Sequence, residues 1–253
     1  MTKLKLLILV ALMGAGCQRV DVSSQPASWE LACPRASGPI QIDGKLDEEA
    51  WRHAKLVALD ISRDQQQQGF TLEEKGTARL LWDDRFLYVG FEFVDSDVVA
   101  LGKEDDEGQH LLGDVAEIFL KPTDQTWYWE LHVTPAGYVT QYWCVGRGRW
   151  GLKDEGRHVK PRFVQAAAQV QGTLNDYTDR DQGWTAEVAI PWKDLDRFGG
   201  RPDAKANWTI LLARYNYTRY RVQGTGPELS SWPVLPRAFF HLVEDYAPLK
   251  LVP

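Results

Sequence analysis

The sequence predicts an all-β fold: a single antiparallel β-sandwich with a few short helices. Many short segments of the 253-residue chain alternate apolar and polar residues, helical stretches are few, and no long linker divides the chain. Alternation with a period of two is typical of strands, and many short strands in one chain favour a sandwich. With 44% hydrophobic residues, the chain can bury a substantial core.

The expected elements follow one another along the chain. Residues 39–44 predict a first strand and turn, and Asp47 is a candidate N-cap for a short helix over 48–54. The glutamines at 65–68 indicate a solvated loop. Residues 77–82 and 86–94 predict a hairpin around Asp83-Asp84-Arg85. Further strands are expected at 114–120, 127–134, 137–145, 161–171, 183–190 and 208–217, with a helical turn over 191–198.

The N-terminus has the layout of an export signal. Two lysines precede the apolar run LLILVALM (6–13), and Gly14-Ala15-Gly16 leads to Cys17. We therefore expect a lipoprotein signal peptide over 1–16, lipidation of Cys17, a tether over 17–35 and one domain over 36–253. Ordinary signal-peptidase cleavage is the alternative. The expected location is extracytoplasmic, on a bacterial membrane; Gln18 favours the outer membrane, since Asp at that position often marks inner-membrane retention.

Cysteine pairing and cofactors are left open by the sequence. Cys33 and Cys144 form a disulfide in one reading and are two buried thiols in the other. The five histidines lack zinc spacing. No cofactor is expected, although the acidic residues between Asp95 and Glu107 leave structural calcium as an alternative.

Charge and motifs exclude several functions. The net charge is −6 without a basic stripe, which argues against nucleic acid as a partner. Residues 146–151, GRGRWG, match a dinucleotide-binding pattern, but no helix is expected to open within them. No catalytic motif is found, so no catalytic residue is assigned.

The stretch GDVAEIFLKP (113–122) places a carboxylate among apolar neighbours. In a strand, Glu117 shares a face with Val115 and Phe119. An unpaired charge there would be costly. Either a basic partner neutralises Glu117, or that face of the sheet binds something polar.

Four segments in order resemble the family 9 carbohydrate-binding modules and their relatives. They are PIQIDGKLDEEAWRHA (39–54), ARLLWDDRFLYVGFEFVDSDV (78–98), GDVAEIFLKP (113–122) and GWTAEVAIPWKDL (183–195), and residues 129–137 and 230–251 also fit. The resemblance spans roughly residues 36 to 253. It implies a β-sandwich that binds a saccharide, often attached to glycoside hydrolases.

The resemblance also implies a site, residue by residue. Two tryptophans clamp the sugar in binding members; their positions fall on Leu111 and Phe240 here. The family's acidic residue corresponds to Glu117 and its basic residue to His132, which shares a strand face with Tyr128 and Glu130. Arg214 is a candidate contact to Glu117 or to the ligand. As structural alternatives, Glu117 forms an ion pair with Arg214, Phe240 belongs to the core, and Trp143 and Trp150 are the platforms.

The expected function is therefore saccharide binding without catalysis, in support of extracytoplasmic carbohydrate capture or breakdown. A haem-binding electron-transfer sandwich is one alternative, but its relatives use a Met ligand and the only methionines, Met1 and Met13, lie in the signal. A glycoside hydrolase or its accessory is the other alternative.

Overall fold

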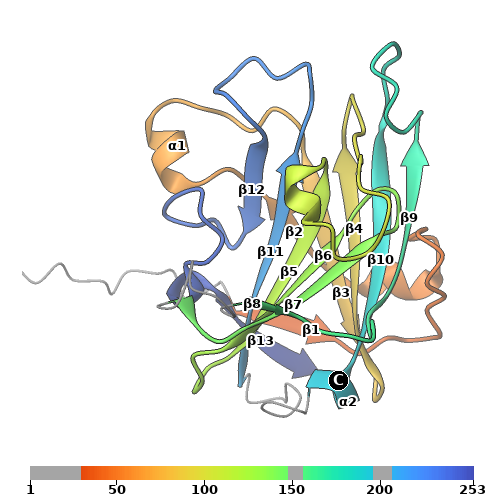
Figure 1. The fold of residues 1–253 in the computed structure, drawn as a ribbon. Coiled ribbons are helices and arrows are strands. Elements are labelled where there is room, and N and C mark those ends of the chain that lie inside the picture. Colours follow the sequence, from red (N-terminus) through yellow and green to blue (C-terminus); the bar gives the residue numbers. More distant parts are fainter. Residues whose placement is uncertain (1–29, 148–155, 196–206) are drawn as a thin grey trace, which may run out of the picture.

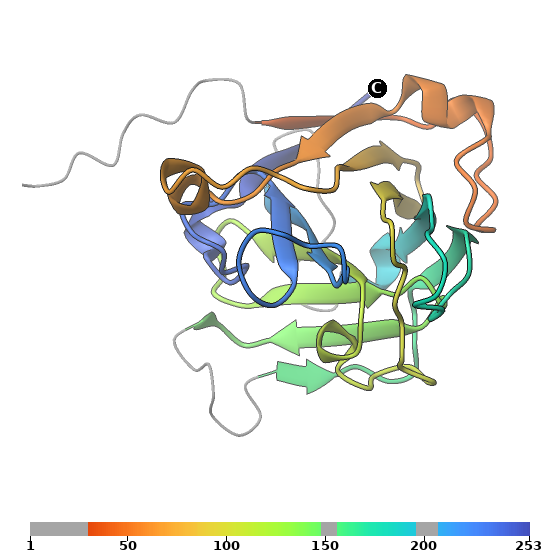
Figure 2. The same ribbon diagram turned by 90° about the horizontal axis from the view of Figure 1, so that it is seen from above.

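Two β-sheets lie face to face in the computed structural model, which describes residues 30–147, 156–195 and 207–253 (Figure 1). This arrangement confirms the predicted sandwich. Figure 2 shows the two layers from above. Within the described part of the chain, no helix has the length and apolar character needed to cross a membrane.

The larger sheet has eight strands, all antiparallel to their neighbours except one pair. Its order is β1 (Leu31–Pro34), β13 (Ala247–Val252), β11 (Trp208–Asn216), β5 (Val115–Pro122), β6 (Tyr128–Val133), β7 (Val139–Cys144) and β8 (Gly156–His158), with β12 (Glu228–Trp232) also paired to β11. The exception is β1, which runs parallel to β13 with Leu31 opposite Leu249.

The smaller sheet has five antiparallel strands. Its order is β2 (Lys55–Leu59), β3 (Gly76–Trp82), β4 (Phe86–Val94), β10 (Gly183–Pro191) and β9 (Gln165–Gln171). Short helices lie in the connections: η1 (Glu49–His53), α1 (Arg63–Gln67), η2 (Gln109–Leu111), α2 (Trp192–Leu195) and η5 (Val243–Asp245).

The predicted hairpin and the six further strands are confirmed to within a few residues at their ends. Three expectations were wrong. Residues 39–44 form no strand, because the backbone N–H groups of Asp43 and Gly44 bond to a side chain, Glu187, instead of a neighbouring strand. The first strand in the described part of the chain, β1, begins at Leu31, inside the segment expected to be a tether, and pairs with the last strand. The glutamine run was expected to be a loop, but three of its residues, 65–67, belong to the helix α1.

Glu187 connects two of the segments that carry the family resemblance. Its carboxylate accepts hydrogen bonds from the backbone of Asp43 (3.0 Å) and Gly44 (2.9 Å) and from the Trp51 indole (2.8 Å). Gly44 has φ +88°, and a Cβ there would lie 2.7 Å from the backbone of Ala168. The motif IDG…W thus docks a loop onto the smaller sheet, and only glycine fits its turn.

Asp83 fixes the hairpin between β3 and β4 in a similar way. Its side chain accepts hydrogen bonds from the backbone of Phe86 (2.7 Å) and from the Tyr88 hydroxyl (2.8 Å). The indole of Trp192, in the last family segment, donates to the Asp83 carbonyl (2.7 Å). These contacts show that much of the family signal encodes the scaffold.

Both faces of the larger sheet are buried in its centre. One face packs on the smaller sheet around Trp129, Trp184 and Trp208. The outer face is covered by the C-terminal segment, defined here as residues 235–246, and forms a second cluster with Phe119, Tyr128 and Leu211. Every residue of β6 is therefore buried. Polar side chains on the outer face of β5 and β6 are consequently enclosed.

Cys33 and Cys144 are both buried and form no disulfide with each other. Cys33 lies in the core between the sheets, whereas Cys144 lies in the cluster on the outer face of the larger sheet. The larger sheet thus separates the two thiols. Burial raises the pKa of the Cys33 thiol, which keeps it in its protonated form.

Candidate functional site

The candidate site is built on the outer face of the larger sheet. The register of β5 and β6 sets Glu117 opposite His132 and Phe119 opposite Glu130. Glu130 and His132 are two residues apart, so both point to this face. Glu117, Glu130 and His132 are 2%, 7% and 0% exposed.

These three side chains form one cluster of ionisable groups in contact. The Nε2 atom of His132 lies 3.1 Å from Oε1 of Glu117 and 2.8 Å from Oε1 of Glu130. The partner of the carboxylate among apolar neighbours is thus the histidine on the next strand. Pairing of this kind offsets the desolvation cost of burying a charged group.

The cluster carries two carboxyl groups and one imidazole, and the environment separates their pKa values. Burial raises the pKa of Glu117 to about 8, although the nearby His132 partly opposes this. Burial also acts to raise the pKa of Glu130, but the hydrogen bond and charge of His132 outweigh it and lower the value. For His132, burial is outweighed by the two carboxyl groups, so its pKa is raised. The environment thus favours the charged forms of Glu130 and His132 and the neutral form of Glu117.

A third element brings His110 to the cluster. The His110 ring, in η2, lies edge-on to the His132 ring with centroids 5.7 Å apart and is 5.7 Å from the Tyr215 ring. The loop is anchored because the Tyr217 hydroxyl donates to the His110 carbonyl (2.7 Å) and the Gln109 amide donates to the Glu104 carbonyl (2.7 Å). Burial and the charge of His132 lower the pKa of His110.

The C-terminal segment forms the roof. The Phe240 ring meets Tyr215 edge-on at 5.5 Å and Phe119 at 6.3 Å, and Phe240 is only 5% exposed. Nδ1 of His241 lies 2.8 Å from the hydroxyl of Tyr128 in β6. Between roof and sheet lies a cavity of about 130 Å³, lined by His110, Glu117, Glu130, Tyr215, Leu229 and residues 238–241.

Of the four predicted contact residues, three are brought together and one is not. Glu117 and Phe240 line this cavity and His132 contacts Glu117 behind its wall, whereas Arg214 lies on the opposite face of the larger sheet. There it is fully buried and bonded to Asp95 (2.9 Å) and Asn216 (3.0 Å). The expected contact between Arg214 and Glu117 was therefore wrong, because residue 214 pairs with Ala116 and points into the core.

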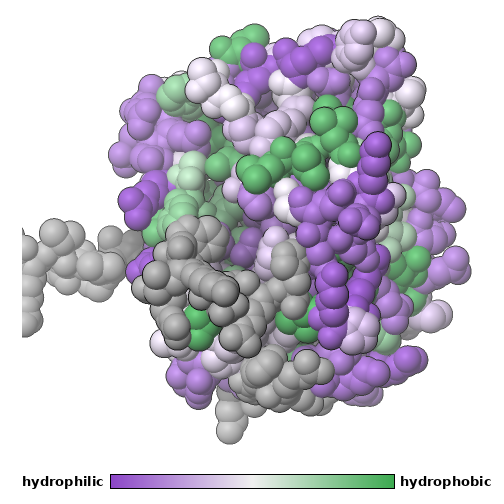
Figure 3. All heavy atoms as spheres, viewed as in Figure 1, coloured by the Kyte–Doolittle hydropathy of each residue, from purple (hydrophilic) through white to green (hydrophobic). Residues whose placement is uncertain are grey.

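The two stacking positions differ in exposure. Leu111 is 73% exposed and directly follows His110, whereas Phe240 is part of the core cluster under the roof. Phe240 thus follows the structural alternative. Trp143 packs against the core between the sheets, and Trp150 lies outside the described residues. The face seen in Figure 3 is largely hydrophilic, with separate hydrophobic patches.

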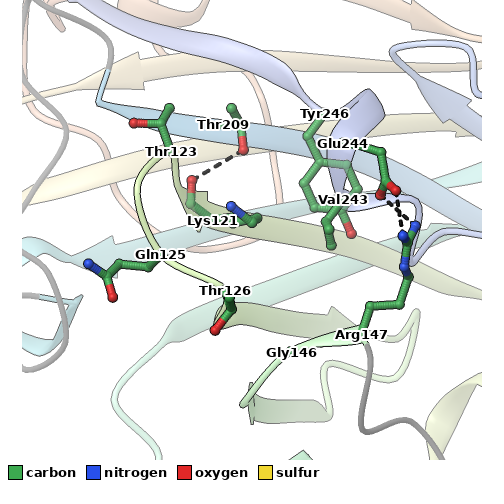
Figure 4. A pocket seen from close by; sticks show the side chains of 10 residues that line it. All are labelled: Lys121, Thr123, Gln125, Thr126, Gly146, Arg147, Thr209, Val243, Glu244 and Tyr246. Carbon is green, nitrogen blue, oxygen red and sulfur yellow. Dashed lines mark hydrogen bonds and ion pairs between the residues drawn. The ribbon is translucent and has the colours of Figure 1, made fainter.

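A larger pocket lies elsewhere on the molecule. It has a volume of about 580 Å³ and walls that combine polar and apolar surface, and an ion pair between Arg147 and Glu244 lies on one side (Figure 4). Its one aromatic wall residue, Tyr246, is 3% exposed and offers no open ring face. None of the predicted contact residues lines it.

The acidic loop considered for calcium is satisfied largely by protein donors. Asp95 bonds to Arg214, Asp97 accepts from the Arg219 backbone (2.8 Å), and Asp105 accepts from the Val139 backbone (2.7 Å). In the described part of the chain, one group of three potential metal ligands converges: His110, Glu117 and His132.

Sequence reasoning missed three residues of the site: His110, Glu130 and Tyr215. The alternation in β6 does place Glu130 on the face of His132, which is a usable signal. Tyr215 required the register of β11 against β5. His110 lies in a loop, and no local pattern reports where a loop folds back.

Comparisons with known proteins agree with the architecture. A family model described as carbohydrate family 9 binding domain-like matches residues 42–216. A candidate carbohydrate-binding protein from Bacteroides uniformis has a similar structure, with a TM-score of 0.65 at 14% identity, covering 88% of this chain and 99% of its own.

Two further solved structures come from one family 9 carbohydrate-binding module of Caldicellulosiruptor kristjanssonii. Its complex with cellotriose has a TM-score of 0.52 at 13% identity, covering 88% of this chain and 93% of the module. Its complex with glucose has a TM-score of 0.51 at 14% identity, covering 87% and 94%. At identities this low, the structural similarity shows a shared fold alone. No curated protein matches the sequence.

Proposed function

This chain belongs to the carbohydrate family 9 binding domain-like family, and on that premise we propose that it binds a saccharide without cleaving it. The observation that carries the proposal is a cavity lined by Glu117 and Glu130, which His132 contacts from behind, beneath aromatic residues of the roof. Sugars need directional partners for their hydroxyls and apolar surfaces for their ring faces. The cavity supplies both.

The size of the cavity limits how a ligand sits. At about 130 Å³ it is smaller than the roughly 300 Å³ at which small-molecule sites usually begin. We propose that one polar edge of a terminal sugar enters and the rest lies outside, over the loop that carries Leu111. A neutral Glu117 both donates and accepts a hydrogen bond, which matches a hydroxyl.

The same geometry favours binding over hydrolysis. A glycosidase needs two carboxyl groups on either side of the scissile bond. Glu117 and Glu130 instead share a single histidine at one side of a small cavity. This leaves no space for two sugar rings joined between them.

The location is part of the proposal. Two lysines, an apolar run and three small residues precede Cys17, and this order supports export of the chain and lipidation of Cys17. We propose that the lipid holds the saccharide-binding domain outside the cytoplasm, at the outer membrane. Residues 1–29, which include Cys17, lie outside the described part of the chain.

A glycan array with residues 18–253, followed by calorimetry on any hit, tests the proposal. Glu117→Ala, which removes both the donor and the acceptor, should lower the affinity by about tenfold, the value of one lost hydrogen bond. Glu92→Ala is the control, because Glu92 lies on the smaller sheet with its side chain 56% exposed. An array without hits, or equal affinities for the two variants, contradicts the proposal.

A further inference from the structure

The buried cluster has the composition of a metal centre. We propose that His110, Glu117 and His132 bind a divalent transition-metal ion, with Zn²⁺ as the best match. The ion would occupy the inner end of the cavity beneath the C-terminal segment. Metal binding at this cluster does not depend on the saccharide proposal.

The first argument is convergence from three separate elements. His110 comes from η2, Glu117 from β5 and His132 from β6. Each offers one ligand atom, and these atoms all lie within 4.8 Å of one another. Zinc bonds of about 2.0–2.2 Å place tetrahedral ligands roughly 3.4 Å apart, so the ligand atoms would have to approach one another by at most about 1.4 Å around the ion.

The second argument is a hydrogen-bond deficit. The Nδ1 atoms of His110 and His132 are buried and have no hydrogen-bond partner among the described residues. His132 is 0% exposed, so water does not replace the missing partner from the surface. A buried polar atom without a partner costs about 1–3 kcal/mol, and a metal ion that displaces a ring proton is one means of satisfying an imidazole nitrogen.

The third argument is support around the ligands. A metal-binding histidine usually donates a hydrogen bond from its other ring nitrogen to a carboxylate or a carbonyl, which fixes the orientation of the ring. Glu130 lies 2.8 Å from Nε2 of His132, and the carbonyl of His110 is itself held by Tyr217. Two of the three ligands thus lie on strands of the sheet and the third lies on an anchored loop.

The ligand types select the ion. Two imidazoles and one carboxylate suit Zn²⁺ and its first-row neighbours, whereas Ca²⁺ and Mg²⁺ require more oxygen ligands. Three protein ligands also leave one position of a tetrahedron open. The adjoining cavity has room for a water molecule or a hydroxyl oxygen in that position.

Titration of metal-free protein with Zn²⁺ tests the proposal. Residues 18–253, which include every described residue, are prepared without a histidine tag and dialysed against EDTA. We expect one Zn²⁺ per chain and at least a tenfold loss of affinity in His110→Ala, whose loop position makes misfolding a small risk. His53→Ala is the matched control, because the His53 side chain is 65% exposed and outside the cluster; it should bind like the wild type.

Co²⁺ gives a second readout that does not rely on affinity. Binding should produce visible absorption of a four- or five-coordinate site, which Glu117→Gln weakens and His110→Ala abolishes. Equal Zn²⁺ affinity in wild type and His110→Ala, or no binding at all, overturns the proposal, as does displacement of Zn²⁺ by equimolar Ca²⁺. Because these titrations contain no saccharide, their failure leaves the glycan result untouched; repeating the glycan measurement with EDTA shows whether the two sites of binding are linked.

Discussion

Arg214 of β11 and Asp95, which follows β4, form an ion pair of 2.9 Å that joins the two sheets. Both side chains are at most 1% exposed. The guanidinium also donates to the Val94 carbonyl (3.0 Å) and lies 4.7 Å from the centre of the Phe93 ring. The arginine expected to contact a ligand is therefore a structural link through the middle of the sandwich.

Loss of Asp95 should be strongly destabilising. Asp95→Ala leaves the Arg214 charge buried without its ion-pair partner, which typically costs about 3–5 kcal/mol of the free energy of unfolding. Glu92→Ala removes an exposed ion pair of the same 2.9 Å length with Arg79 and should cost below about 1 kcal/mol. Urea unfolding measures both, and similar losses in the two variants would contradict the prediction.

The same region should make stability depend on pH. Burial raises the pKa of Asp114 well above its usual value, with the charge of Asp95 adding to the effect, and burial likewise raises that of Asp95. Above about pH 4 the unfolded chain releases protons that the folded chain keeps, so stability should fall as pH rises until both groups ionise.

Asp114→Asn isolates this contribution. The free energy of unfolding, followed by urea from pH 4 to 8, should decline less steeply in the variant than in the wild type. Asp84→Asn changes a side chain that is 71% exposed and should leave the slope unaltered. An unchanged slope in Asp114→Asn would show that this carboxyl group does not titrate abnormally.

Phe240→Ala should unfold the domain more readily instead of only weakening ligand binding. The ring is buried against Phe119 and Tyr215, and truncation of a buried phenylalanine costs about 3–5 kcal/mol. Phe239→Ala, at a partly exposed neighbour, should cost less. Thermal and urea unfolding compare the two, and a neutral Phe240→Ala would show that the roof is loosely packed.

The fold was largely predictable because its determinants are local or repeated. The alternation over Phe86–Val94 identifies a strand. The hydrogen bond from the Trp192 indole to the Asp83 carbonyl shows that two segments of the family resemblance hold the scaffold together. The strand β1 was not predictable, since four residues carry little periodicity and the partner is the end of the chain. The segment before the turn at Gly44 was mistaken for a strand, because the partner of this turn, Glu187, is remote in sequence.

The site was predictable only in part. The family resemblance assigned Glu117 and His132 to one site, and strand alternation placed Arg214 on a face with Asn216. It did not reveal which face of β11 matches which face of β5, because register is a property of the pair. His110 enters through tertiary contacts of a loop.

Leu111→Trp should strengthen saccharide binding. The residue is 73% exposed, and an aromatic ring there restores the platform that family resemblance places at this position. A stacking ring contributes about 0.5–1.5 kcal/mol, which corresponds to at most about a tenfold gain in affinity. Leu101→Trp, at a residue 59% exposed, is the control. Calorimetry with the array hit compares them, and an equal gain in both would indicate nonspecific adhesion.

Cys17→Ser should release the protein from membranes. Without the thiol no lipid is attached, so the chain should move from the membrane to the soluble fraction after cell lysis. Cys33→Ser, which changes a buried thiol that forms no disulfide, keeps Cys17 and should remain with membranes. Membrane association of Cys17→Ser equal to the wild type would refute lipid anchoring.

The parallel pair of β1 and β13 has a consequence for the order of events during folding. Leu31 lies opposite Leu249, so nearly the whole domain separates the two strands along the chain. Such a distant contact forms slowly, because the ends of a very long loop must meet before it contributes any stability. During synthesis, β1 emerges early and must wait for the last residues to arrive. Until then one edge of the larger sheet is open, and this interval is when the chain is most exposed to aggregation.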